Sequence, residues 1–363
     1  MKWVRLAVVL ILVLAATVGR ADAAALPGDL TEQVNVAALE EAAPEELKGL
    51  DVFSFTSLED VTARLKEHLR TGLSDALGGA VSGALRLLLV VLFCALCQSV
   101  AVAGGVRVIH LAGAAGVSLV ALADLHIMIG LGRETIAALS DFTTALFPAL
   151  TAASVLGGGA VSAPARQTVT LFCSTLLIRV ISQVLLPLTY GYAALCVASA
   201  VVGRGRLNAL ARLLRWGVVT VLTVILMGYV AYLTVSGAVA STADASAVRA
   251  ARFAISGMVP IVGGILSDAT GALLGGASVL RNAVGLFGML GVLTCCALPF
   301  LRLGAQFLLY KLVAALSAIL SDSPVAALVQ ELGNVFALMM AMTGSCALVT
   351  LLSLVSAVSA VTP

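Results

Sequence analysis

Charged residues are scarce in this chain. Lysine, arginine, aspartate and glutamate make up 11% of its 363 residues, whereas soluble domains carry about 25%. From Gly79 to Pro363 only 21 residues are charged, and the mean hydropathy of the chain is +1.10. A membrane-spanning helix needs about 20 mostly apolar residues, because the hydrocarbon core is about 30 Å thick and offers no water to the backbone. The lack of charge therefore excludes most soluble enzymes and predicts an all-α, polytopic integral membrane protein.

Aromatic residues and catalytic motifs are also lacking. Aromatics make up 5%, and small or aliphatic side chains fill the apolar runs, which favours close helix packing. The chain has no phosphate-binding loop, no His-Glu-x-x-His motif and no nucleophile elbow. We therefore predict a protein that is not an enzyme, with no catalytic residues, no cofactor and no metal site. Its basic residues are scattered between apolar runs, which predicts no nucleic-acid binding.

The seven cysteines do not form a recognisable site. Cys94 and Cys97 have a C-x-x-C spacing, but they lie in an apolar run without a second such pair. A thiol in that setting behaves as a small apolar side chain. We interpret the cysteines as packing residues.

Residues 1–25 have the features of a signal peptide. Lys2 and Arg5 precede an apolar run, and small residues at 21–25 fit the pattern that signal peptidase accepts. The run is short for a stable span, so we predict cleavage after Ala23 or Ala25, the alternative being an uncleaved anchor. Either way, the next segment lies outside the cytoplasm.

Residues 26–78 are acidic, with eleven acidic side chains against four basic ones. The first half lacks an apolar stripe and is predicted to be a loose extracytoplasmic tether. In the second half a Ser57-x-x-Asp60 start signal precedes apolar residues at helical spacing, namely Leu58, Val61, Leu65, Leu69, Leu73 and Leu77. This pattern predicts an amphipathic extracytoplasmic helix that lies on the membrane surface or on a partner.

Residues 79–363 form the predicted membrane domain. Charges, glycines and prolines divide it into about nine candidate spans: 79–104, 106–132, 141–160, 166–186, 187–203, 216–240, 257–280, 283–301 and 333–361, with 304–320 as a short tenth. The strongest basic cluster is Arg204, Arg206, Arg212 and Arg215. Loops with this charge face the cytoplasm, and five crossings from an outside start bring the cluster there. The same count of crossings places Arg107, Arg166 and Arg281 in the cytoplasm, as expected for basic residues. It places Arg133, Arg249, Arg252 and Arg302 outside, which is contrary to this expectation.

Three places interrupt the helical pattern: Gly157-Gly158-Gly159 before Pro164, then Pro187, then Pro260 before Gly263-Gly264. They indicate either broken or re-entrant helices that line a cavity, or ordinary loops and kinks. Six ionisable residues fall within predicted spans: Arg86, Asp124, His126, Arg179, Asp268 and Lys311. Such residues are functional candidates because they are costly in hydrocarbon. We favour pairing of the basic ones with Asp124 or Asp268, or snorkelling to an interface, over transport chemistry.

The most distinctive stretch is 241–285. Ser241-Thr242-Ala243-Asp244 is typical of a helix start, and Arg249 and Arg252 follow on one face of a short helix. For these two arginines we weigh a contact with a partner against a topogenic or lipid-headgroup role. The candidate interaction or structural positions of the stretch are Asp244, Arg249, Arg252, Pro260, Gly263, Gly264, Asp268, Arg281 and Asn282.

This stretch resembles the stage III sporulation protein AE family of endospore-forming bacteria. The family and this chain share a similar run. It consists of Ala-Asp, an Arg, a basic residue followed by Phe-Ala, then Pro-x-Val-Gly-Gly, and a basic residue followed by Asn-Ala-Val-Gly. The signal peptide, the acidic segment, Phe147-Pro148, the glycine triplet, Pro187 and the hydrophobic tail also follow the family's order, so the resemblance covers nearly the whole chain. Arg252 and Arg281 stand where many members have lysine, which keeps the charge but changes the donor geometry.

The resemblance implies a multispan subunit of a mother-cell complex that meets a forespore-membrane partner across the intermembrane space. It implies a channel or secretion-like conduit needed for forespore development, with the other stage III sporulation A operon products as partners and the mother-cell membrane around the forespore as the location. The alternative is a stand-alone secondary transporter or permease. A protein of that class would show an internal repeat and a buried ion site. Pro260-x-x-Gly263 and Phe147-Pro148 are only weak signs of duplicated broken helices.

Overall fold

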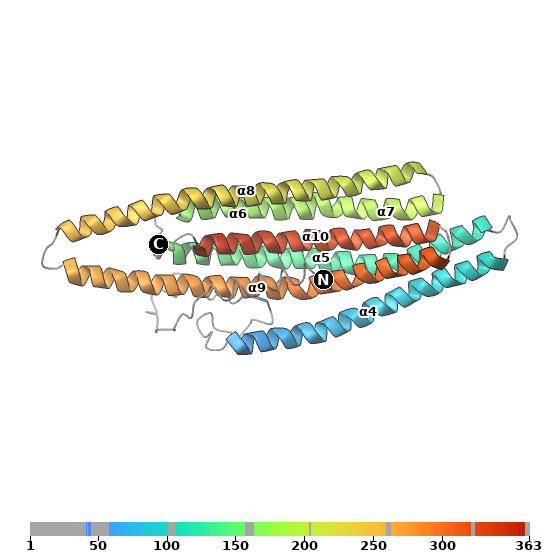
Figure 1. Cartoon of the computed structure of the whole chain (residues 1–363), viewed down its shortest axis with the longest axis horizontal. Helices are drawn as coiled ribbons and strands as arrows, with labels where there is room; N and C mark the ends of the chain where they lie inside the picture. Colours follow the sequence, from blue (N-terminus) through green and yellow to red (C-terminus); the bar gives the residue numbers. More distant parts are fainter. Residues whose placement is uncertain are drawn as a thin grey trace.

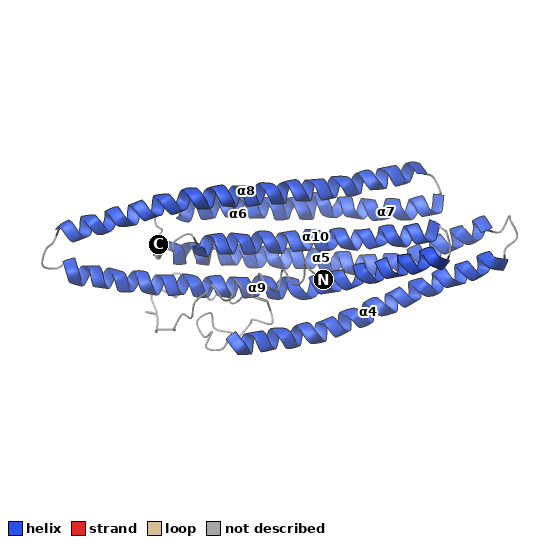
Figure 2. Ribbon diagram, in the orientation of Figure 1, coloured by secondary structure: helices blue, strands red, loops and turns tan. Residues whose placement is uncertain are grey.

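The chain forms a bundle of long helices. The computed structural model describes residues 41, 43, 44, 58–100, 106–156, 163–202, 205–258, 263–320 and 324–359. Within the helices, the side chains of residues 236–281 are among those that it does not describe. Its elements are α4 (Leu58–Val100), α5 (Val106–Leu156), α6 (Ala163–Val180), the π-helical turn η2 (Ile181–Leu185), α7 (Leu186–Val202), α8 (Gly205–Met258), α9 (Gly263–Leu320) and α10 (Pro324–Ser359). Figure 2 shows helices and no strand among the described residues. The predicted all-α class is confirmed.

In the described part of the chain, six helical rods are long and apolar enough to cross a membrane: α4, α5, the continuous rod of α6, η2 and α7, then α8, α9 and α10. This confirms the predicted polytopic helical class. The rods are also long: α9 has 58 residues, which is about 87 Å at 1.5 Å per residue. That length is nearly three times the hydrocarbon core of about 30 Å, so the longest helices extend beyond the core or tilt within it.

The structure has six such rods where the sequence predicted about nine spans. The predicted spans 106–132 and 141–160 are parts of α5, and 166–186 and 187–203 are parts of the α6–α7 rod. The predicted spans 283–301 and 304–320, with most of 257–280, are parts of α9. The charged residues that divided these spans, such as Arg133 and Glu134, are exposed on the side of an unbroken helix. A hydropathy pattern does not distinguish such a residue from a loop.

The predicted amphipathic helix is the first part of α4, which begins at Leu58, immediately after the Ser57 start signal. It does not form a separate surface helix, because α4 continues without interruption to Val100. Gly72 in this part lies against α9, where an added Cβ would be 2.3 Å from Leu298 Cδ1. The signal peptide and most of the acidic tether lie outside the described residues.

Two of the three predicted interruptions coincide with helix boundaries. α5 ends at Leu156, before the glycine triplet, and α8 ends at Met258 while α9 begins at Gly263. Pro260 and the glycine triplet lie outside the described residues. The third interruption, Pro187, does not end its rod: it follows η2, where the Leu186 N–H donates to the Ile181 carbonyl. The wider π-turn accommodates a proline, which has no N–H and whose ring crowds the preceding turn.

The bundle has two parts, which Figure 1 shows one above the other. Helices α4, α5, α9 and α10 make the most extensive contacts and form the four-helix group. Helices α6, α7 and α8, with η2, form the three-helix layer, which reaches the group mainly through α10 and α5. We call the contact between the two parts the seam.

Successive rods run in opposite directions, so helix ends gather at two ends of the bundle (Figure 1). The α4–α5, α7–α8 and α9–α10 junctions lie at one end, the basic end, which also holds Arg212 and Arg215 of the first turns of α8. The α5–α6 and α8–α9 junctions lie at the opposite end. There α8 and α9 reach further than the other helices.

Glycines of α9 let the four-helix group pack closely. An added Cβ would lie 2.4 Å from Val358 at Gly285, 2.7 Å from Leu146 at Gly288, and 2.2 Å from the Phe142 ring at Gly291. Phe142 and Leu146 are buried on α5, and Val358 is on α10. These three glycines, spaced one turn apart, allow α9 to contact both neighbours, as small residues do in membrane helix pairs.

Candidate functional site

Asp124 of α5 is held by neutral donors inside the four-helix group. Its Oδ2 accepts hydrogen bonds from Gln306 Nε2 at 3.0 Å and from the Tyr310 hydroxyl at 2.9 Å, both on α9. Gln306 and Tyr310 are 4% and 0% exposed. On α4, a Cβ added at Gly83 would come within 2.9 Å of the same oxygen. Three helices therefore contribute to the surroundings of this carboxyl group, and Asp124 itself is half-buried.

The basic residues proposed from the sequence as partners do not pair with Asp124. Neither Arg86, Arg179 nor Lys311 forms an ion pair with it in the described part of the chain. Arg86 donates from Nε to the Ser82 carbonyl, and Lys311 Nζ lies 5.9 Å from the Phe307 ring centre. Asp124 is instead paired with amide and hydroxyl donors, which satisfy the carboxylate without burying a second charge; the preference for a structural role over transport chemistry stays a prediction.

We expect Asp124→Ala to destabilise the protein by roughly 2 to 4 kcal/mol, because Gln306 and Tyr310 would both lose a charged acceptor in a buried site. Thermal unfolding of the detergent-purified protein measures the change. The matched control is Asp141→Ala on the same helix, because Asp141 is exposed. Equal stability of the two variants would contradict a structural role for this cluster.

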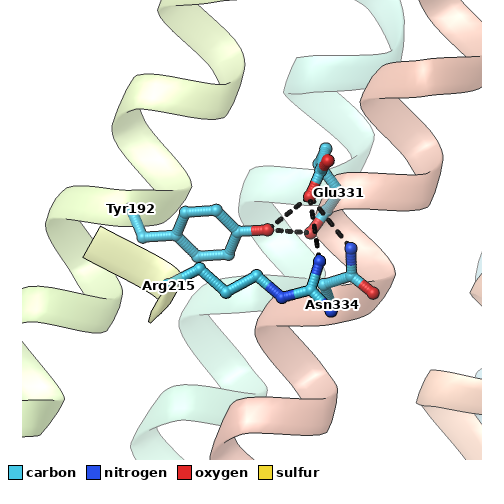
Figure 3. A network of polar contacts seen from close by, with 4 residues as sticks. All are labelled: Tyr192, Arg215, Glu331 and Asn334. Atoms are coloured by element: carbon cyan, nitrogen blue, oxygen red, sulfur yellow. Dashed lines mark hydrogen bonds and ion pairs between the residues drawn. The ribbon is translucent and has the colours of Figure 1, made fainter. Parts of the chain in front are cut away.

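A second cluster joins α7, α8 and α10 across the seam (Figure 3). Glu331 Oε2 accepts a hydrogen bond from the Tyr192 hydroxyl at 2.5 Å and another from Asn334 Nδ2 at 2.9 Å. Arg215 Nη1 lies 3.9 Å from the same oxygen, and the side chains of Arg215 and Glu331 are 44% and 37% exposed. Cys196, one turn after Tyr192, is buried beside it.

A third cluster, made of hydroxyl groups, joins α6, α8 and α10 further along the same seam. Ser174 is within hydrogen-bond distance of the Tyr229 hydroxyl, at 3.3 Å, and of Ser353 Oγ, at 3.1 Å. Tyr229 and Ser353 also bond to each other. Ser174 and Ser353 are 0% exposed, and Tyr229 is 5% exposed. The seam is thus linked by a charged, half-exposed cluster at one place and a neutral, buried one at another.

The described positions proposed from the sequence lie on α8 and α9. Asp244, Arg249 and Arg252 are on the last turns of α8, and Gly263, Gly264 and Asp268 are on the first turns of α9. Arg281 and Asn282 lie about 27 Å further along α9 than its first residue. Of these side chains only Asn282 is described, and it is half-buried; Pro260 lies outside the described residues. Their roles stay predictions.

Among the described residues, no group of three or more histidine, cysteine, aspartate or glutamate side chains has the arrangement of a metal site. All seven cysteines are free thiols, and Cys94 is buried where a Cβ at Gly113 would lie 2.7 Å from its Sγ. This arrangement agrees with the interpretation of Cys94 as a packing residue.

Sequence reasoning singled out Asp124 but missed its donors and the whole Glu331 cluster. Glu331 precedes the predicted span 333–361 and is therefore not among the ionisable residues expected within the membrane. Tyrosine is rare here, with five in the chain, and three of the five make these polar contacts. Rare tyrosines within apolar helices are a signal that points to such clusters.

The comparisons with known proteins agree with this architecture. The model of the family described as stage III sporulation protein AE matches residues 60–361, which include nearly all of the six rods. The chain belongs to this family. A stage III sporulation protein AE of Bacillus subtilis (strain 168) is 30% identical over 207 residues, which are 57% of this chain and 52% of that protein. The match therefore spans about half of the relative's length. No solved structure matches significantly.

Membership of this family implies a role in sporulation. With six helices able to cross a membrane, the chain is a multi-pass membrane protein. The family match also confirms the resemblance drawn from the sequence.

Proposed function

We propose that this chain is the membrane subunit of a channel or secretion-like complex that connects the mother cell with the forespore and supports forespore development. The observation that carries the proposal is the family match over residues 60–361, which extends along the helical bundle. Its partners would be the other products of the stage III sporulation A operon and, through them, a protein of the forespore membrane.

The charge distribution supports an orientation for this subunit. The basic end of the bundle holds Arg212 and Arg215, and such flanking charges favour the cytoplasm. The opposite end, where α4 begins and where α8 and α9 reach furthest, would then face the intermembrane space. Arg166, at the start of α6, would also lie outside, contrary to the nine-span count.

This orientation brings the predicted contact elements to one side of the membrane. The acidic segment precedes α4 and joins the bundle at the outer end. Arg249 and Arg252 lie on the far turns of α8 at the same end. A subunit that meets partners in the intermembrane space needs its contact surfaces on that side, and the membrane-embedded rods would serve as the base or export gate of the assembly.

Purification of the tagged chain from sporulating cells in mild detergent tests the proposal. We expect the other operon products to co-purify with the tagged chain. Their yield should fall to background when the tagged chain is expressed alone in vegetative cells. A chain that purifies without partners from sporulating cells would contradict the proposal.

The second candidate is a stand-alone secondary transporter in the mother-cell membrane. The Asp124 cluster favours it, because a carboxyl group placed among three helices is a feature of ion-coupled carriers. Flux into liposomes that contain the purified chain alone would support this candidate. Absence of flux together with co-purifying partners would support the complex.

A further inference from the structure

Two clusters of described residues supply polar links across the seam. On the three-helix layer these are Tyr192 and Arg215, which meet Glu331, and the hydroxyls of Ser174 and Tyr229, which meet Ser353. Both Glu331 and Ser353 are on α10, about 33 Å apart along that helix. The two clusters are therefore separated along α10 by about the thickness of a hydrocarbon core.

The two clusters differ in strength and access. The hydroxyl cluster is neutral and fully enclosed, so its opening would leave hydroxyls without partners in hydrocarbon. The Glu331 cluster is half-exposed at the basic end, and its ion pair is long, at 3.9 Å. Water reaching Glu331 and Arg215 would replace the protein contacts at small cost, as for exposed ion pairs. The seam is therefore easier to open at the basic end.

A break in the regular α-helical pattern lies between the clusters on the α6–α7 rod. The π-turn η2, Ile181–Leu185, falls between Ser174 and Tyr192, and Pro187 follows it directly. π-turns and prolines are the usual places where a helix bends, because the regular ladder of hydrogen bonds is already interrupted there. Bending at η2 would move Tyr192 while Ser174 stays in place.

We propose that the Glu331 cluster is a releasable latch at the cytoplasmic end of the seam: the three-helix layer parts from α10 there, with η2 as hinge and the hydroxyl cluster as pivot. The motion belongs to this chain alone and goes beyond the proposed function, since it requires no partner. Release exposes the space beside Cys196, which is buried in the closed bundle.

The reactivity of Cys196 with N-ethylmaleimide tests the latch, in full-length protein whose other six cysteines are replaced by alanine. Tyr192→Phe removes the hydroxyl that bonds Glu331 but keeps the ring and the carboxylate. We expect it to raise the labelling rate of Cys196 by about tenfold, as fits the loss of one hydrogen bond to a charged acceptor. The Tyr192 hydroxyl also interacts with the Cys196 thiol, and its loss does not favour the reactive thiolate, so a direct effect on the thiol would not accelerate labelling.

Three further variants make the test specific. Arg215→Gln removes the ion pair together with a positive charge near the Cys196 thiol, a loss that does not favour the reactive thiolate, and it should give a smaller rise. Glu134→Gln, at an exposed site on α5, should give none. A chain that keeps only Cys346, which is 0% exposed and lies beside Cys296 of α9, should show no change with Tyr192→Phe.

A disulfide at the pivot distinguishes a local opening at the Glu331 cluster from a general loosening of the helix bundle. Ser174→Cys and Ser353→Cys replace hydroxyls that are 3.1 Å apart, and after oxidation the pair should not prevent the rise in Cys196 labelling. An unchanged Cys196 rate in Tyr192→Phe would overturn the proposal. So would an equal rise at Cys346, or loss of the effect when the pivot is crosslinked.

Discussion

Gly291→Leu should prevent accumulation of the folded protein. Even the first added carbon would lie 2.2 Å from Cζ of Phe142, and that ring is 1% exposed in the middle of the core. The ring is buried, so room for the new side chain must come from repacking of its neighbours or from a shift of α9 against α5. Overpacking a tight core costs about 1 to 3 kcal/mol and occasionally more, and a leucine adds several carbons.

The measurement is the yield of monodisperse protein in detergent, together with its thermal unfolding. Gly228→Leu on α8 is the matched control, because nothing lies within 4 Å of the Cβ position there. Gly228→Leu should leave yield and unfolding near those of the wild type. Normal yield of Gly291→Leu would show that α9 and α5 do not pack as described.

Neutralising Arg249 and Arg252 together, as Arg249→Gln and Arg252→Gln, should abolish assembly of the complex and with it the formation of heat-resistant spores. Both residues lie on the far turns of α8 and share one face of the helix, because they are three positions apart. Arginine is among the residues on which binding energy concentrates, and losing two such contacts weakens an interface by roughly 100-fold.

Co-purification with the operon partners and spore counts measure this effect. The control removes two charges elsewhere, as Arg70→Gln with Arg133→Gln, since both residues are exposed. If the Arg249 and Arg252 variant assembles and sporulates like the wild type, the arginines have no role in partner contact. If the variant instead inserts with altered orientation, shown by protease access to tagged ends, their role is topogenic.

The sequence predicted the local features of the fold well. It predicted the start of α4 within one residue, because a start signal and an apolar stripe are both read over one or two turns. It also predicted the two places where α5 and α8 end, because runs of glycine and proline prevent a helix from continuing.

The span count could not be predicted in the same way. A hydropathy profile adds the transfer energies of neighbouring residues. An exposed pair such as Arg133 and Glu134 therefore lowers the local hydropathy as a loop does. Whether a helix continues past such residues depends on what its other faces pack against. In α5 the neighbouring Thr135 and Ile136 are buried, and the helix continues.

The partners in the polar clusters also required the tertiary structure. Asp124 stood out in the sequence, but a basic partner was the expectation, and Gln306 and Tyr310 took that place. Tyr192 and Glu331 are 139 positions apart, a separation over which no local pattern carries information.

The sequence by itself determined that lipid surrounds this protein, that its secondary structure is helical, and to which family it belongs, since these depend on composition, periodicity and short motifs. The tertiary structure alone decided which apolar runs form one rod, how the rods divide into a layer and a group, and which polar side chains link them. The physical reason is that side-chain pairing between helices depends on their distance and rotation, which follow from the packing of all six rods together.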